Sequence, residues 1–126
     1  MAGETVLIVE DNEKNMKLVR DILQATGYDP VEASSGEEAL ALAAEDAPAL
    51  VLMDIQLPDI DGSEALRHLR SDERTAGIPV LALTAQAMQG DRESFLAAGF
   101  DGYLSKPVDV DELIETVRRY CDGAAE

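Results

Sequence analysis

Polar side chains that can bind a metal ion or phosphate follow several short apolar runs of the chain. In order they are Glu10 with Asp11, Asp54, Thr84, and Ser105 with Lys106. If the carboxylates met, they would repel one another, and one pKa would rise unless a cation lay between them. Mg²⁺ suits a site with one or two carboxylates, several waters and a phosphate oxygen. The alternative is that each residue is an ordinary solvated side chain at the end of an element.

A metal-bound carboxylate beside a lysine and a threonine indicates phosphoryl transfer. An aspartate can act as the nucleophile and form an acyl phosphate. The metal ion and Lys106 would neutralise charge on the phosphoryl oxygens, and the Thr84 hydroxyl would donate a hydrogen bond. Lys106 precedes Pro107, and a peptide bond before proline can lock a cis turn that fixes the direction of a side chain.

Short apolar runs alternate with helical patterns along the chain. The clearest runs are 6–9, 50–53 and 80–83, and weaker ones are 31–33 and 103–105. Continuous short runs are typical of strands buried on both faces of a parallel sheet. Capping residues and apolar spacing predict helices at 13–26, from 35 to about 44, around 65–69, at 86–98 and at 109–121. The alternation predicts an α/β fold with helices on both faces of a parallel five-stranded sheet.

We expect the doubly wound, flavodoxin-like strand order 2-1-3-4-5. In that order the first and third strands are neighbours at the topological switch point, where such sheets bind ligands beyond the carboxyl ends of the strands. Glu10, Asp11 and Asp54 would then lie within a few ångströms of one another.

Composition sets the class of protein. The 126 residues are enough for one domain with its own core. A net charge of −16 disfavours partners such as nucleic acid or an anionic membrane. A single cysteine excludes an internal disulfide and a cysteine-based zinc site, and no apolar run approaches a membrane span. The amino-terminal segment lacks the pattern of a signal peptide, so we expect a soluble, cytoplasmic protein.

Four stretches resemble the receiver domains of two-component response regulators, the CheY-like family. They are VLIVEDN at 6–12, LMDIQLPDIDG at 52–62, LTA at 83–85 and GYLSKP at 102–107. The resemblance spreads from about residue 5 to residue 121. It implies one receiver domain over residues 1–126, with no output domain. It also implies a signalling switch that catalyses only its own phosphorylation and dephosphorylation.

The resemblance also implies a metal site. Asp54 would be the phosphoacceptor and, with Asp11, a direct ligand of Mg²⁺ or Mn²⁺. Glu10 would act through water, and the backbone carbonyl of Gln56 would supply a further ligand. Gln56 and Gln86 would tune the rate of dephosphorylation.

The switch residues follow from the same resemblance. Thr84 would move toward the phosphoryl group, Lys106 would pair with it, and Tyr103 would swing inward. The phosphoryl donor would be a histidine kinase or a histidine phosphotransfer protein. A downstream protein would bind the face of the fourth helix, fifth strand and fifth helix, and the protein would be a monomer or a weak homodimer. Tyr103 has a simpler interpretation as a half-buried tyrosine of an edge strand.

Several alternatives stay open. The chain resembles receiver segments of hybrid histidine kinases as well as stand-alone receivers. A Mg²⁺-dependent phosphatase with an aspartate nucleophile is a distant alternative, because Gln56 stands where such enzymes carry a second aspartate. His68 has no metal partner at a comparable spacing, and Cys121 is expected in the core or at its rim. The acidity indicates either a high-salt cytoplasm or docking on basic partners.

Overall fold

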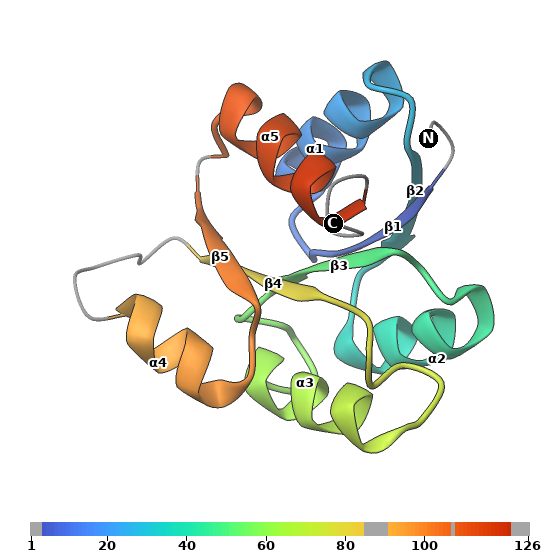
Figure 1. The fold of residues 1–126 in the computed structure, drawn as a ribbon, viewed down its shortest axis with the longest axis vertical. Coiled ribbons are helices and arrows are strands. Elements are labelled where there is room, and N and C mark those ends of the chain that lie inside the picture. The colour runs from blue at the N-terminus through green and yellow to red at the C-terminus, as the bar shows by residue number, and fades with distance from the viewer. Residues whose placement is uncertain (1–3, 85–90, 107, 122–126) are drawn as a thin grey trace.

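The computed structural model describes residues 4–84, 91–106 and 108–121. Strands and helices alternate through this part of the chain (Figure 1). The strands are β1 (Thr5–Val9), β2 (Asp29–Ala33), β3 (Leu50–Asp54), β4 (Val80–Thr84) and β5 (Gly102–Ser105). The helices are α1 (Glu13–Ala25), α2 (Gly36–Asp46), α3 (Gly62–Ser71), α4 (Asp91–Ala98) and α5 (Val110–Cys121). The predicted elements are confirmed, although the part of the fourth helix expected at 86–90 lies outside the described residues.

The strands form one parallel sheet in the order β2-β1-β3-β4-β5, which confirms the predicted topology. Val9 at the end of β1 lies opposite Met53 of β3, and Asp54 lies opposite Leu83 of β4. The carboxyl ends of β1, β3 and β4 therefore come together at one edge, with Asp54 in the middle.

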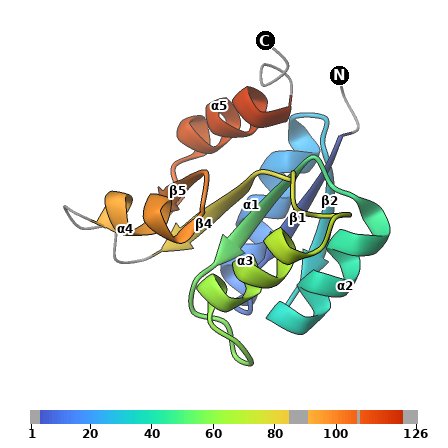
Figure 2. The same ribbon diagram turned by 60° about the horizontal axis from the view of Figure 1, so that its bottom comes forward.

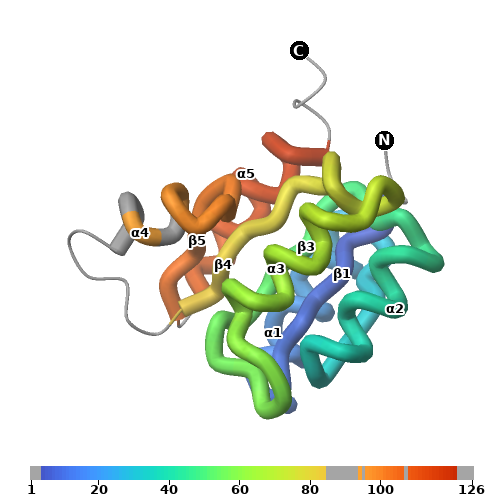
Figure 3. Tube along the Cα trace, turned by 90° about the horizontal axis from the view of Figure 1, so that it is seen from below, coloured from blue at the N-terminus to red at the C-terminus, as the bar shows by residue number. Residues whose placement is uncertain are grey.

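Each face of the sheet has its own apolar core. Figures 1 and 3 show α1 and α5 on one face and α2 and α3 on the other, and Figure 2 gives the same layers in an oblique view. Alternate residues of a strand go to opposite cores: Val6 and Ile8 pack with α1 and α5, whereas Leu7 and Val9 pack with α2 and α3. Burial on both faces explains why the strands read as unbroken apolar runs.

Local chemistry sets the helix ends. The Asn12 side chain caps α1 by accepting hydrogen bonds from the N–H groups of Lys14 and Asn15. α1 ends just before Gly27, whose φ of 94° is a left-handed conformation that glycine adopts without strain. α2 continues to Asp46, two residues beyond the predicted end.

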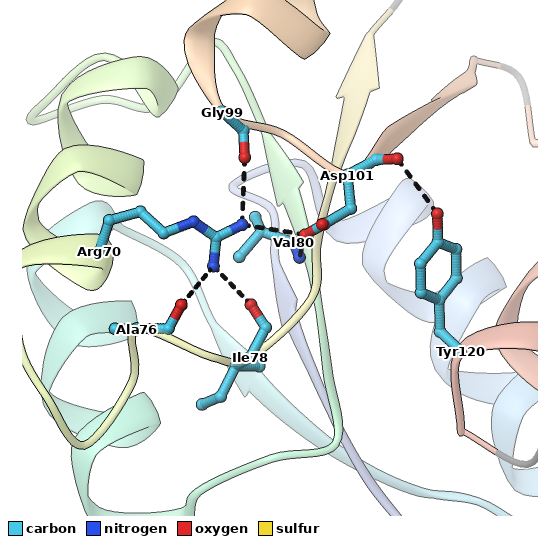
Figure 4. Close-up of polar contacts among 7 residues, drawn as sticks. All are labelled: Arg70, Ala76, Ile78, Val80, Gly99, Asp101 and Tyr120. Atoms are coloured by element: carbon cyan, nitrogen blue, oxygen red, sulfur yellow. Dashed lines mark hydrogen bonds and ion pairs between the residues drawn. The ribbon is translucent and has the colours of Figure 1, made fainter. Parts of the chain in front are cut away.

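Arg70, in the last turn of α3, joins two connections at the amino end of β4 (Figure 4). Its Nη1 donates to the carbonyl oxygens of Ala76, at 3.1 Å, and Ile78, at 2.7 Å. Its Nη2 donates to the carbonyl oxygen of Gly99, at 3.1 Å, and to Asp101 Oδ2, at 2.9 Å. One guanidinium thus joins the α3–β4 connection to the α4–β5 connection.

Asp101 extends this arrangement to α5. Its Oδ2 also accepts a hydrogen bond from the Val80 N–H at 2.7 Å, and its carbonyl oxygen accepts one from the Tyr120 hydroxyl at 3.1 Å (Figure 4). We call Arg70, Asp101 and Tyr120 the Arg70 clasp. It lies at the first residue of β4, at the opposite end of that strand from Thr84.

Candidate active site

Three carboxylates meet at the carboxyl edge of the sheet, as the sequence predicted. Each of Glu10, Asp11 and Asp54 offers an oxygen, and these oxygens lie within 4.8 Å of one another. Glu10 and Asp54 are only 2% and 5% exposed, whereas Asp11 is exposed. Glu10 and Asp11 directly follow the end of β1, and Asp54 is the last residue of β3.

Lys106 lies between the two buried carboxylates. Its Nζ is 2.7 Å from Glu10 Oε1 and 3.0 Å from Asp54 Oδ2. Its own backbone N–H donates to the carbonyl oxygen of Thr84 at 2.8 Å, which fixes the start of the β5–α5 connection against the end of β4. The predicted meeting of Lys106 with Asp54 is therefore present in the fold.

Backbone N–H groups orient both carboxylates. The Gln56 N–H donates to Asp54 Oδ1 at 2.9 Å, so each Asp54 oxygen has a different partner. The Asn12 N–H donates to Glu10 Oε2 at 3.2 Å. The site is thus preorganised by the first residues that follow β1 and β3.

Thr84 is the last residue of β4 and is 5% exposed. Tyr103, on the neighbouring strand β5, is half-buried and packs at the margin of the core under α2 and α3. Both residues stand where the sequence placed them, on strands that border the site. Gln86 and Pro107 lie outside the described residues, so a cis bond after Lys106 stays a prediction.

The charge balance of the site is negative. Burial raises the pKa of Glu10; Lys106 opposes this, and the neighbouring Asp54 adds to it. Burial on its own would lower the pKa of Lys106, but its bonds to Glu10 and Asp54 prevail and raise it. Lys106 is thus held as a cation, and one cation faces three carboxylates.

These residues fit a divalent cation. Closely placed carboxylate oxygens with an excess of negative charge are the ligand set that Mg²⁺ selects. Glu10, Asp11 and Asp54 offer the oxygens for such an ion, and the part of the Gln56 backbone carbonyl as a further ligand stays a prediction. It is the one group of three or more potential metal ligands found among residues 4–84, 91–106 and 108–121. His68 is exposed on α3 and belongs to no such group, and Cys121 packs at the core margin as predicted.

Sequence reasoning missed Asp59. Its two carboxylate oxygens accept hydrogen bonds from the N–H groups of Gly36, at 2.8 Å, and Glu37, at 2.9 Å. The first of these bonds joins residues 23 positions apart. No local pattern indicates such a pairing, and the only signal was the presence of Asp59 in the loop that follows Asp54.

The comparisons with known proteins agree with this geometry. The family model that describes the response regulator receiver domain matches residues 6–118 of this sequence. The polar-differentiation response regulator DivK of Brucella ovis is 50% identical over 121 residues, which cover 96% of this chain and 98% of DivK. No helix in the described part of the chain is long and apolar enough to cross a membrane.

Solved structures give the same result. The receiver domain of a sensor histidine kinase from Pseudomonas aeruginosa, with magnesium in its active-site cleft, is 38% identical with a TM-score of 0.87. That similarity covers 95% of this chain and 98% of the other. A Saccharomyces cerevisiae response regulator receiver, solved with a histidine phosphotransfer protein, is 30% identical over 99% of this chain and 93% of its own, with a TM-score of 0.89. The chain therefore belongs to the response regulator receiver domains of two-component signalling.

Proposed function

We propose that Asp54 accepts a phosphoryl group from a histidine kinase or a histidine phosphotransfer protein in a Mg²⁺-dependent reaction. The protein then changes conformation and so controls the binding of a partner. The observation that carries this proposal is the buried Asp54 carboxylate, held between Lys106 and an acidic pair that can bind a metal ion. The residues 1–126 act as one receiver domain in this proposal.

The chemistry follows from the contacts of Asp54. A carboxylate oxygen of Asp54 attacks the phosphorus atom, and the bond from phosphorus to the donor nitrogen breaks. The donor imidazole keeps the electron pair and takes up a proton, and an acyl phosphate forms on Asp54. When bound, the divalent ion supplies positive charge that offsets the charge of the phosphoryl oxygens.

Lys106 and Thr84 act on the product. Lys106 already contacts Asp54 Oδ2, so its ammonium group is in place to pair with a phosphoryl oxygen. The Thr84 hydroxyl, at the end of the adjacent strand β4, donates to another. These new contacts stabilise one of two conformations and so shift a pre-existing equilibrium.

The output lies on the face of α4, β5 and α5. A groove of about 230 Å³ is lined by all three elements, including Leu96 of α4, Tyr103 of β5 and Tyr120 of α5. Leu96 is 42% exposed, so its apolar side chain is accessible to a partner at this groove. Rotation of Tyr103 would change the shape of this groove and thereby couple Asp54 to a downstream protein. A monomer or a weak homodimer, located in the cytoplasm, belongs to the same proposal.

Among receivers, we favour a regulator of the DivK type over the receiver segment of a hybrid kinase. The support is the 50% identity with DivK, against 38% with the receiver of the sensor histidine kinase. An aspartate-nucleophile phosphatase is disfavoured by Gln56, which offers no carboxylate at that position. Steady, multiple-turnover release of phosphate from a phosphomonoester would contradict the switch.

The test is the intact mass of the protein after incubation with acetyl phosphate, with and without Mg²⁺. We expect the wild type to gain one phosphoryl group only with Mg²⁺, and Asp54→Asn to gain none. The incubation with acetyl phosphate is repeated with Mn²⁺ in place of Mg²⁺. A folded wild type that is not phosphorylated by acetyl phosphate or by a histidine phosphotransfer protein would contradict the proposal.

A further inference from the structure

The loop that follows the phosphoacceptor is attached to the start of α2 through Asp59. Asp59 Oδ1 accepts from the Gly36 N–H and Oδ2 from the Glu37 N–H, at 2.8 and 2.9 Å. Both donors belong to the first turn of α2, whose N–H groups have no partner within the helix. Figures 2 and 3 show this loop, in green, beside the teal amino-terminal end of α2.

Packing reinforces the same attachment. Gly36 is buried, and a Cβ atom placed there would collide with Cγ1 of Ile60. The side chain of Ile60 therefore occupies the space that a side chain at position 36 would need. Two adjacent loop residues therefore hold the start of α2: Asp59 by hydrogen bonds to its N–H groups, and Ile60 by packing against Gly36.

The rest of the loop is closed on itself. The Gly62 N–H donates to the carbonyl oxygen of Ile55 at 3.0 Å, and Gln56 and Asp61 form an antiparallel bridge. At the other end, the Gln56 N–H donates to Asp54 Oδ1. The loop therefore forms a compact unit, and Asp59 fixes this unit to a second element of the fold.

This unit carries Gln56, whose backbone carbonyl is the expected metal ligand of the proposed function. Residues one step removed from a metal ion commonly orient the groups that bind it, and their loss weakens metal binding. A carboxylate with both oxygens engaged by a helix start is a rigid anchor, because it satisfies two N–H groups and benefits from the positive end of the helix.

We propose that Asp59 is a positioning residue for the metal site: by fastening the loop to α2, it holds the Gln56 backbone in the orientation that binds Mg²⁺. This inference rests on the proposed function. Asp59 itself does not contact the ion or the phosphoryl group.

The test compares Asp59→Ala with Ser35→Ala. Ser35 caps the same helix, because its hydroxyl accepts from the Glu38 N–H at 3.2 Å, and within the described residues its side chain has no hydrogen bond to the loop. Both changes weaken the start of α2, and only the first releases the loop. We expect Mg²⁺ binding, measured by isothermal titration calorimetry, to weaken about tenfold in Asp59→Ala and by less than about twofold in Ser35→Ala.

A second readout needs no metal. Amide hydrogen exchange at Gln56, followed by NMR in metal-free protein, is expected to accelerate in Asp59→Ala and to stay as in the wild type in Ser35→Ala. Asp59→Asn, which keeps one acceptor oxygen, is expected to be intermediate and serves as the test if the alanine variant does not fold.

The outcomes separate the two proposals. If the wild type binds Mg²⁺ and the Asp59 variants bind it equally well, or if Ser35→Ala has the same effect, the role of Asp59 is overturned and the proposed function stands. If the folded wild type binds no divalent ion, the proposed function fails together with this inference.

Discussion

At the scale of single residues, Lys106 has two partners that a bound metal ion would also engage. Its ammonium group contacts both Glu10 and Asp54, so it neutralises part of the charge that would attract Mg²⁺. Under the proposed function Lys106 would have two opposite effects, because it would help the phosphoryl group to bind and would compete with the metal ion for the carboxylates.

Substitution Lys106→Ala separates these effects. We expect phosphorylation by acetyl phosphate to slow by about a hundredfold, the usual cost of losing one group that stabilises developing charge. Mg²⁺ binding is expected to be as tight as in the wild type or tighter, because the competing cation is gone. Stopped-flow rates and calorimetric titration measure the two quantities. Lys17→Ala, which removes an exposed lysine paired with Asp21, is the control.

Weaker Mg²⁺ binding in Lys106→Ala would contradict this account. It would mean that Lys106 holds the carboxylates in place for the ion rather than competing with it.

Residue positions at strand ends were predictable, whereas loop contacts were not. Glu10 and Lys106 directly follow β1 and β5, and Asp54 is the last residue of β3, so a parallel sheet brings the three to one edge whatever the details of the loops. Asp59 differs because its position depends on the closure of a loop, and on a helix that begins 23 residues earlier. Short-range sequence patterns carry no information on such a pairing.

At the scale of elements, the lowered pKa of Asp59 makes the stability contributed at the start of α2 depend on pH. The N–H groups of Gly36 and Glu37 hold the pKa of this exposed carboxyl below its ordinary value. A carboxyl whose pKa is lower in the folded state stabilises the fold above its unfolded pKa, which is about 3.9, and this contribution is lost as the pH falls through the folded pKa.

We therefore expect Asp59→Asn to lower the melting temperature most at neutral pH. The difference from the wild type should be constant above about pH 5 and should shrink below about pH 4, where the wild type becomes neutral at this position as well. Circular dichroism melts from acid to neutral pH measure it. A difference that stays the same at all pH values would show that the charge of Asp59 contributes nothing.

The Arg70 clasp makes a separate prediction for the elements β4, β5 and α5. Arg70→Met removes four hydrogen bonds that join the two connections. We expect a loss of about 2–4 kcal/mol in the free energy of unfolding, because partly buried carbonyl groups and Asp101 lose their partner. Urea denaturation measures this loss.

Arg74→Met is the matched control. Arg74 pairs with Asp72 at 2.8 Å on the surface, where solvent screens such a pair and it contributes little to stability. The rate of Asp54 phosphorylation should change in neither variant, since the clasp lies at the far end of β4 from Thr84. Equal losses of stability in the two variants would show that the clasp adds nothing beyond an exposed ion pair.

Element types were predictable for a reason that these contacts make clear. Strands buried on both faces give unbroken apolar runs, and capping residues such as Asn12 and Ser35 fix helix starts through their own side chains. The end of α2 was less well predicted because it depends on Ala47, a non-glycine residue with a φ of 45° that no composition rule would place there. Local signals thus specified the starts of α1 and α2 better than the end of α2.

At the scale of the whole molecule, the net charge of −16 is the dominant property. The chain has 26 acidic residues against 10 lysines and arginines. Only three of these are lysines, and one of them, Lys106, lies at the carboxylate cluster rather than on the open surface. Crowded like charges destabilise a compact state through mutual repulsion, and salt screens that repulsion over a distance of about 3 Å at 1 M. A chain adapted to a high-salt cytoplasm would therefore gain stability from salt, whereas an ordinary acidic receiver would change little.

We expect the melting temperature to be higher in about 1 M KCl than in dilute buffer. For a domain of this size, each kcal/mol of repulsion removed should raise it by roughly 3–5 °C. Calorimetric melts measure the shift, and sucrose at matched osmolarity is the control, because it favours compact states without screening charge. A rise in KCl alone would support adaptation to high salt, since KCl screens charge and sucrose does not. Equal midpoints in dilute buffer and in KCl would reject that adaptation and leave docking on a basic partner surface as the role of the acidic charge.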